Sequence, residues 1–566
     1  MRPTRRNFVG GAAALGAGAM LPWAAQAQVH PTRQSLASFS RDPARVASLR
    51  RGVAVMRARA PSDPKSWFFQ SAIHAYNDAA YADALARDPG VARVDAQRYW
   101  NKCPHFGQSS ADFLIWHRAY LYVFERILRE AANDPMLALP YWDYSKPSGR
   151  DFPAIFADER LGDGSPNPLY DPNREAAFVT RRFEITEDVG QARATMAAPI
   201  FFSDVGRVGF AGDTLDSQHT QLGLVEQRPH NDIHTAVGGA IGNVNGAMAD
   251  IPTAAFDPVF WVHHANIDRL WAEWSCMPDK SWGPMPPESW LGAAPWEFLD
   301  VDGTSLRQSR RFFIERISIA VFYDTDKQHG PPMPLPPPMV MAAAPPPPTA
   351  VAPGGGLGND RSLRGAMEMT TPPPVTEREL VADATPVIAS PKKGAVRALA
   401  GAQTVVATGG RLPEGAPTPV AGAAPGGAAA TAPPPPPAPP PPRLMQFSTT
   451  PPRRRVTLEL ADITFARTPS SGFAVYLADA AAVAAGRYGA FVGLIDLFGA
   501  THGHSAGMAG MPAIQRFDVT DIVARMGPGL TIRIEPYDLL VSKSGASAPK
   551  RDDAVKIGKV RFVETS

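Results

Sequence analysis

The sequence has 566 residues, 60 of them proline, and a formal net charge of +2 at pH 7. A chain of this length exceeds what one hydrophobic core usually organises, so we expect two or more domains. Three arginines in the first 27 residues supply the positive excess, so the net charge of the remaining residues is −1. This charge gives no reason to expect nucleic acid or an anionic membrane as a partner.

The N-terminal segment predicts export. The pair Arg5-Arg6 precedes a weakly apolar stretch rich in alanine and glycine, and Ala25-Gln26-Ala27 offers a small-x-small cleavage site. A membrane anchor is the alternative, but the apolar run is too short and too glycine-rich to span a bilayer. We therefore predict a Tat-type signal peptide over residues 1–27, a periplasmic or extracellular mature protein, and no membrane span.

Residues 28–330 carry long helical patterns and many aromatic side chains. Residues 113–132 are apolar on most faces, which predicts a buried helix. Residues 264–274 are similar, and Asp257-Pro258 just before them is a typical helix start. We predict a mainly α domain, a bundle of helices, over residues 28–330.

The C-terminal part has a different composition. Residues 331–376 are rich in proline and glycine and cannot pack a core, which predicts an extended linker. Beyond them, short alternating or apolar runs such as 455–466 are separated by turn residues, which predicts a β-sandwich. We place this domain over residues 377–566, with a proline-rich insertion near 411–450.

Histidines are the clearest chemical signal in the helical part. His230 and His234 are spaced i, i+4, which puts them on one helix face and suits two ligands of one metal. A surface helix would also explain such a pair. The same spacing occurs in zinc proteases, but Asn231 stands where their motif has its glutamate base, so a hydrolytic zinc site is disfavoured.

A third ligand for this metal is expected from residues 257–272. His264 and Asp268 share one helix face, where the carboxylate could pair with an arginine or orient an imidazole. The adjacent His263 points about 100° away on a helix, so we expect it to pack or to support the site.

Three further histidines lie upstream: His74, His105 and His117. Twelve residues would separate the last two by about 18 Å on a continuous helix, so they can share a metal only if His105 lies on a loop that folds back. Two sets of three imidazoles suit copper better than zinc or iron. Three histidines with an open position also occur in zinc hydrolases, so ligand type alone leaves both metals open.

Four stretches within residues 65–275 resemble the type 3 copper family of tyrosinases, catechol oxidases and hemocyanins: HAYND, WHRAYLYVFERIL, PHNDIH and DPVFWVHHANIDRLW. The resemblance implies two copper ions. It assigns the first to His74, His105 and His117, and the second to His230, His234 and His264. It implies O2 and phenols as small-molecule partners, with oxidation of o-diphenols to o-quinones and, as a further reaction, ortho-hydroxylation of monophenols.

The resemblance extends beyond these stretches. Residues 289–303, SWLGAAPWEFLDVDG, are similar to the segment that follows the core of plant-type polyphenol oxidases, and the C-terminal strands resemble their β domain. In that group the β domain covers the active-site entrance and keeps the enzyme latent. The proline-rich tract is a natural target for an activating protease.

The family layout also implies roles for residues around the metals. Glu226 matches a glutamate that holds a water, and Asn231 would complete that site and help to deprotonate a phenol. A surface acid in a turn is the alternative for Glu226. Thr235 and Ile251 would line the substrate entrance.

Two departures from the family pattern concern the first copper. Its second and third histidines are usually nine residues apart, not twelve, which weakens the case for His105. Asp78 occupies the position of the cysteine that plant enzymes cross-link to a histidine, so that cross-link is not expected. The two cysteines, Cys103 and Cys276, could pair with each other in an exported protein.

Two other functions use the same residues: an oxygen carrier resembling hemocyanin, and a copper-binding protein without turnover. Residues 501–511, THGHSAGMAGM, could capture copper, although a mobile loop explains them more simply.

Overall fold

The computed structural model describes residues 31–314 without 217, 242 and 243, and then 321–328 and 335. In the C-terminal part it describes 377–381, 387–389, 394–398, 406–407, 454–465, 469–498, 514–527, 530–544 and 555–565. The expected signal peptide, nearly all of the expected linker, the insertion near 411–450 and the loop 501–511 lie outside the described residues. The expected domain boundaries therefore stay predictions.

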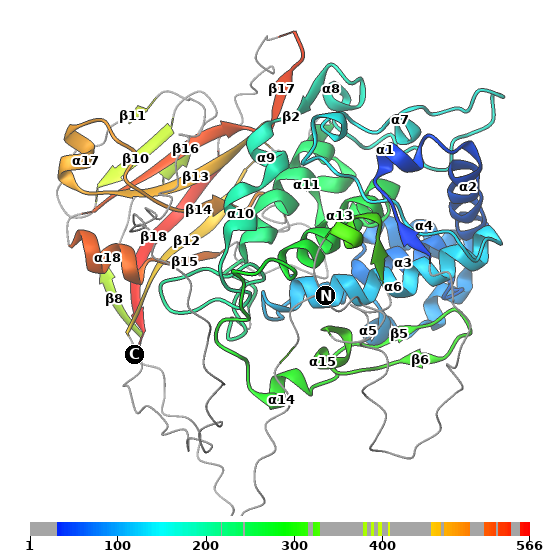
Figure 1. The fold of residues 1–566 in the computed structure, drawn as a ribbon, viewed down its shortest axis with the longest axis horizontal. Coiled ribbons are helices and arrows are strands. Elements are labelled where there is room, and N and C mark those ends of the chain that lie inside the picture. Colours follow the sequence, from blue (N-terminus) through cyan, green and yellow to red (C-terminus); the bar gives the residue numbers. More distant parts are fainter. Residues whose placement is uncertain are drawn as a thin grey trace, which may run out of the picture.

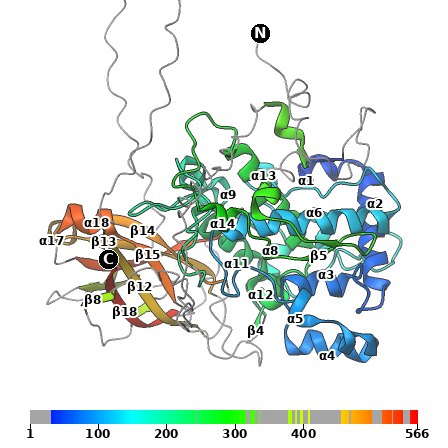
Figure 2. The same cartoon turned by 90° about the horizontal axis from the view of Figure 1, so that it is seen from below.

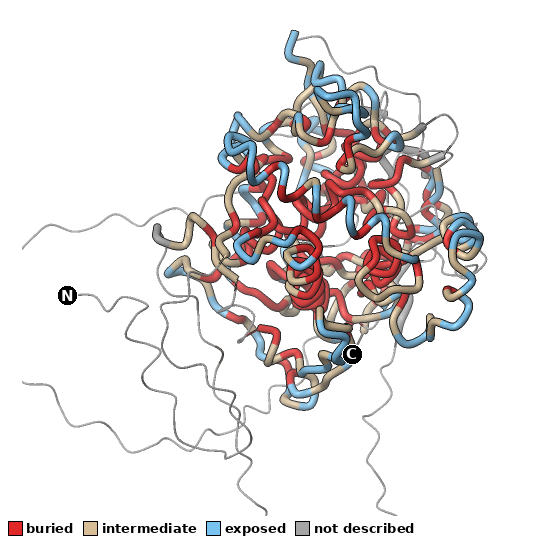
Figure 3. Tube along the Cα trace, turned by 90° about the vertical axis from the view of Figure 1, so that its right-hand side faces the viewer, coloured by how far each residue is buried: buried red, intermediate tan, exposed pale blue. Residues whose placement is uncertain are grey.

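The helical half is built around α6 (Asp112–Ala132), the predicted helix of residues 113–132 (Figures 1 and 2). It is buried on most faces, as its apolar composition predicts, and it ends at Asn133 in the left-handed conformation, with φ 48°. Helices α2 (Pro43–Ala58) and α13 (Pro258–Trp274) pack against it. Figure 3, which looks onto the right-hand side of Figure 1, shows buried segments gathered in the middle and exposed segments toward the rim.

Helix α13 begins where the sequence predicts. The Asp257 side chain caps it by accepting a hydrogen bond from the Val259 amide at 2.8 Å, and Pro258 fills the first helical position. Arg174 donates two hydrogen bonds to the same carboxylate, at 2.7 and 2.8 Å. The start of α13 is thus fixed both by its own cap and by a buried cation.

Three shorter elements carry residues to the centre of the helical half: α3 (Trp67–His74), the kinked π-helical turn η4 (Glu226–Asn231) and α11 (Asp232–Gly238). Helix α4 (Asp78–Arg87) follows α3 and buries only Ala84.

The C-terminal half is a sandwich of two sheets whose described strand pairs are all antiparallel. One has the strand order β11-β10-β16-β13-β14 and the other β15-β12-β18-β8, with β9 beside β18. Apolar side chains from both sheets form a separate core, among them Leu458, Phe473, Ile532 and Phe562. The predicted fold class, a helical domain followed by a β-sandwich, is confirmed.

The strand bounds are β8 Glu377–Val381, β9 Val387–Ala389, β10 Gly394–Ala398, β11 Val406–Ala407, β12 Arg455–Thr464, β13 Ser471–Ala478, β14 Ala490–Ile495, β15 Gln515–Asp518, β16 Thr531–Asp538 and β18 Val555–Thr565.

The two halves are packed together. Strand β17 (Leu540–Ser542) pairs with β2 (Phe183–Ile185) of the helical half, at the top of Figure 1. Tyr537 of β16 donates to Asp232 at 2.6 Å, and the Leu494 amide donates to the Gln227 side chain at 3.1 Å. The hydrophobic core of the helices also continues into the β domain through Leu494 and Phe498.

None of the helices that the structure describes combines the length and the apolar character needed to cross a bilayer. Cys103 and Cys276 do not form the disulfide that the sequence allowed.

Candidate metal centre

Three imidazole nitrogens converge inside the helical half. Nε2 of His264 lies 3.2 Å from Nε2 of His230 and 3.3 Å from Nε2 of His234, and all three rings are buried. Two nitrogens bound to one metal at about 2.0–2.1 Å with a tetrahedral angle lie about 3.3 Å apart. The three side chains therefore fit one transition-metal ion, and imidazole donors suit copper.

The other ring nitrogens are fixed by hydrogen bonds. In four histidines Nδ1 lies 2.6–3.2 Å from a protein acceptor: Ile251 O for His74, Phe113 O for His117, Asn231 Oδ1 for His230 and Met248 O for His234. A proton on Nδ1 leaves Nε2 with a lone pair, which is the form that binds metal. Nε2 of His74 and of His117 is buried with no hydrogen-bond partner among the described residues.

The pKa values favour the same form. Burial, reinforced by neighbouring imidazoles, lowers the pKa of His74, His117, His230 and His264 well below its ordinary value. Burial lowers the pKa of His234 to about 3. These histidines are therefore neutral at neutral pH and need lose no proton to bind metal.

His263 lies closer to the cluster than expected. Its donor atom is within 4.8 Å of those of His230, His234 and His264, so it does not simply point away from them. Its Nδ1 lies 3.3 Å from the hydroxyl of Tyr144. The two adjacent histidines therefore differ in their partners more than in their distance from the centre.

The upstream histidines do not form one group. The donor atoms of His74, at the end of α3, and His117, in α6, lie within 4.8 Å of the Cys103 sulfur. His105 lies on the turn before α6 that the sequence suggested, but its donor atom is grouped instead with His219 and Glu226. Cys103 joins the two groups, because its Sγ lies 3.0 Å from Nδ1 of His105.

Glu226 is a buried acid rather than a surface acid. Its Oε1 accepts a hydrogen bond from Nε2 of His219 at 2.6 Å and lies 3.1 Å from Nε2 of His105. Burial alone would raise the pKa of Glu226, but His219 and His105 lower it to about 2. The carboxylate is therefore ionised.

The remaining predicted site residues are buried around the histidines. Asn231 accepts a hydrogen bond from Nδ1 of His230 at 2.6 Å, and its Nδ2 has no hydrogen-bond partner among the described residues, so it is not hydrogen-bonded to Glu226 as the family layout would have it. Thr235 donates to the Asn231 carbonyl at 2.9 Å and lines a small cavity between the two domains. Ile251 contacts His74 through its carbonyl.

Sequence reasoning did not single out His219. It lies in a polar stretch, LDSQHTQ, that has neither helical period nor metal-ligand spacing. The one available signal is that it lies seven residues before Glu226.

The contacts of Asp268 decide between the two roles that the sequence left open, pairing with an arginine or orienting an imidazole. Its carboxylate pairs with Arg118 of α6 and, at 3.1 Å, with Arg33, and it accepts a hydrogen bond from Tyr323. It does not orient an imidazole. The pair Arg118–Asp268 joins α6 to α13. The rings of His117, directly before Arg118, and His264, one turn before Asp268, stack 4.2 Å apart at 13°.

The β domain reaches the histidines through Phe498. Its ring stacks on that of His234 at 3.9 Å and 22°, and lies 5.6 Å from the rings of His105 and His230. Phe498 is 1% exposed. An aromatic ring of the chain itself therefore covers one side of the centre.

Residues 64–277 match the family model described as the common central domain of tyrosinase. The chain is 33% identical over 253 residues to a tyrosinase of Hahella sp. (strain CCB-MM4), which covers 41% of this chain and 51% of that protein. It is 29% identical over 281 residues to a chloroplastic polyphenol oxidase of Malus domestica, covering 46% and 42%. The chain thus spans about half the length of these curated relatives.

Among solved structures, latent apple tyrosinase has a similar fold. The TM-score is 0.52 at 20% identity, over 96% of this chain and 98% of that one. At this identity the likeness concerns the fold alone.

Proposed function

Because its tyrosinase central domain makes this chain a member of the tyrosinase and polyphenol oxidase family of type 3 copper proteins, we propose that it is a copper-dependent phenol oxidase. It would use O2 to oxidise o-diphenols to o-quinones and would also hydroxylate monophenols at the ortho position. The observation that carries the proposal is the convergence of three Nε2 atoms within 3.2–3.3 Å at His264.

Two copper ions would supply the redox chemistry with O2. We propose that His230, His234 and His264 hold one ion, and that His74, His105 and His117 hold the other. Support comes from the buried, unpartnered Nε2 atoms of His74 and His117 and from the Nδ1 hydrogen bonds that leave Nε2 available.

We assign to Glu226 the role of accepting the proton of the phenol hydroxyl. Oε2 of this ionised carboxylate is buried and has no hydrogen-bond partner among the described residues. Asn231, whose Nδ2 is also buried and unpartnered, would help to orient a water or a phenol hydroxyl there. Thr235 and Ile251 would line the approach.

Latency is the second part of the proposal. Phe498 covers the rings of His105, His230 and His234, in a position that suits a docked phenol. The β domain would therefore exclude substrate until a protease or another agent displaces it. The twin-arginine segment supports export by the Tat route to the periplasm or beyond; replacing Arg5 and Arg6 with lysine should then retain the protein inside the cell.

The test uses the full-length, copper-loaded protein. Catechol, a neutral monophenol and tyrosine are supplied before and after limited proteolysis, and quinone absorbance is followed. We expect little oxidation before cleavage and rapid oxidation after it, while Phe498→Ala should oxidise catechol without cleavage. Leu497→Ala, at the neighbouring buried position, is the matched control.

No quinone from the cleaved protein, with copper present, would contradict the proposal. Reversible O2 uptake in that case would instead indicate an oxygen carrier, and no O2 uptake would indicate a copper-binding protein without turnover.

A further inference from the structure

His219 reaches the metal centre from a loop that the proposed ligand set does not use. The Asp216 carboxylate accepts hydrogen bonds from the Thr220 hydroxyl at 2.9 Å and from the Thr220 and Gln221 amides. These bonds hold the loop closed around His219. His219 itself has φ +56°, a left-handed conformation that is strained for a residue other than glycine. Such strain is usually retained where a side chain must be held in one place.

The side chain of His219 is hydrogen-bonded to Glu226. Its Nε2 donates to Oε1 at 2.6 Å, and the two side chains are 2% and 0% exposed. This bond is the shorter of two contacts to Oε1, since Nε2 of His105 lies 3.1 Å from the same oxygen, and Oε2 is left as the available acceptor. Oε2 of Glu226 and Nδ1 of His219 are both buried without a hydrogen-bond partner among the described residues. An orphaned acceptor of this kind indicates a place for a water or a substrate hydroxyl.

The same geometry distinguishes His219 from His74 and His117. Their Nε2 atoms are buried with no hydrogen-bond partner among the described residues, whereas Nε2 of His219 donates to Glu226. The acceptor of this bond is a carboxylate, and hydrogen bonds to ionised groups are shorter and stronger than those between neutral groups.

We propose that His219 is a positioning residue. It orients the Glu226 carboxylate so that Oε2 accepts the phenol proton, and it sets the turnover rate without binding copper. This inference rests on the proposed phenol oxidase function and adds a residue to its proton-handling site.

The test compares His219→Leu with His219→Gln in the copper-loaded, proteolytically activated enzyme. Leucine removes the donor, while the glutamine amide can donate from nearly the same position as Nε2. General acid–base groups contribute about 10²–10⁴-fold to rate, so we expect His219→Leu to lower kcat at least about tenfold. KM should stay within about twofold, copper should stay at two ions per chain, and His219→Gln should recover most of kcat. Leu215→Ala, a change at a residue exposed on the same loop, should leave all three quantities unchanged.

Loss of copper from His219→Leu would overturn the proposal, because it would make His219 a ligand. An unchanged kcat, or an equal loss in His219→Gln, would also overturn it, since the hydrogen bond would then not matter. An inactive wild-type enzyme with full copper would instead refute the phenol oxidase function itself, whatever the variants do.

Discussion

At the residue scale, the adjacent histidines of α13 differ in the atoms that their ring nitrogens face. His264 presents Nε2 to His230 and His234, and its Nδ1 is buried with no partner among the described residues. His263 has Nδ1 beside the Tyr144 hydroxyl. Three converging Nε2 atoms satisfy one metal ion, so a fourth imidazole is not needed.

We therefore expect His264→Ala to lower the copper content from two ions to about one per chain, because the second site keeps only two ligands. His263→Ala should retain both ions. Copper is measured by atomic absorption on the dialysed, folded protein, with circular dichroism to confirm folding. Tyr144→Phe, which removes only the hydroxyl beside His263, is the control and should also keep two ions. Equal copper loss in the two histidine variants would refute this division.

Spacing and family resemblance pointed to His230, His234 and His264, and the structure brings their Nε2 atoms together. The i, i+4 spacing alone also fits a surface helix, so the resemblance was needed to select these residues. His219 could not be predicted, because its position depends on a loop closed by side-chain hydrogen bonds. The position of His263 was misjudged because the helical period gives only the angle between adjacent side chains about the helix axis. The histidine cluster is wide enough for both His263 and His264 to lie beside it.

At the scale of elements, a buried ion pair sets the distance between two helices that carry proposed ligands. Arg118 follows His117 on α6, and Asp268 lies one turn after His264 on α13. Both charged side chains are at most 5% exposed, and Arg33 adds a second cation to Asp268. Removing one member of a buried pair leaves an uncompensated charge, which costs about 3–5 kcal/mol.

Asp268→Asn should therefore lower the free energy of unfolding by about 3–5 kcal/mol, because the buried guanidinium groups of Arg118 and Arg33 lose this carboxylate, while Arg33 keeps its pair with Glu125. Urea denaturation of the metal-free protein measures this loss. Asp83→Asn breaks an exposed pair with Arg87 on α4 and should cost about 0–1 kcal/mol. Similar losses in the two variants would show that the Asp268 pair does not hold the helices.

The pH dependence of the Asp268 variant follows from the same pair. Burial opposes ionisation, but Arg118 and Arg33 lower the pKa of Asp268 below its ordinary value. A carboxylate with a lowered pKa stabilises the fold above its unfolded pKa of about 3.9, and this contribution is lost as the pH falls through the folded value. Between pH 5 and 3 the wild type should consequently lose more stability than Asp268→Asn. A parallel decline of the two proteins would contradict this account.

The pairing of strands between the two halves could not be predicted from the sequence. The long helices α6 and α13 have enough turns to reveal a period, but β2 and β17 have three residues each. Their pairing joins segments more than 350 residues apart in the chain. A strand this short shows no alternation, so only the assembled fold reveals it.

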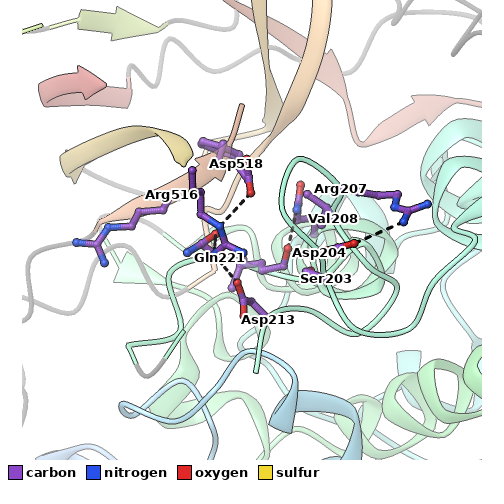
Figure 4. Close-up of a pocket in the computed structure, with 12 residues that line it drawn as sticks. Ser203, Asp204, Arg207, Val208, Asp213, Gln221, Arg516 and Asp518 are labelled. Atoms are coloured by element: carbon purple, nitrogen blue, oxygen red, sulfur yellow. Dashed lines mark hydrogen bonds and ion pairs between the residues drawn. The ribbon is translucent and has the colours of Figure 1, made fainter. Parts of the chain in front are cut away.

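At the scale of the whole molecule, the helical half and the β domain are joined by charges as well as by apolar packing. Arg455 at the start of β12 lies 2.8 Å from Asp213 of the helical half and 3.1 Å from Asp518 of its own domain. Figure 4 shows Asp213, Gln221 and Asp518 around the small cavity between the halves. One cation thus neutralises two carboxylates that face each other across the domain boundary.

Removing this cation should weaken the docking of the β domain. In Arg455→Met the carboxylates of Asp213 and Asp518, 5% and 6% exposed in the intact structure, would be left unpaired and mutually repulsive. Losing one charged hydrogen bond costs about 1.5–3 kcal/mol, and each 1.4 kcal/mol changes an equilibrium about tenfold. We therefore expect the uncleaved variant to oxidise catechol at least about tenfold faster than the uncleaved wild type. Full cleavage should bring the two proteins to the same rate, since the helical half is unchanged.

Arg454→Met is the matched control, because Arg454 is 72% exposed and its nearest acid, Glu564, belongs to the β domain itself. If Arg455→Met stays as latent as Arg454→Met, the remaining contacts between the halves, such as the β17–β2 pairing and the packing around Phe498, hold the β domain over the centre without this cation.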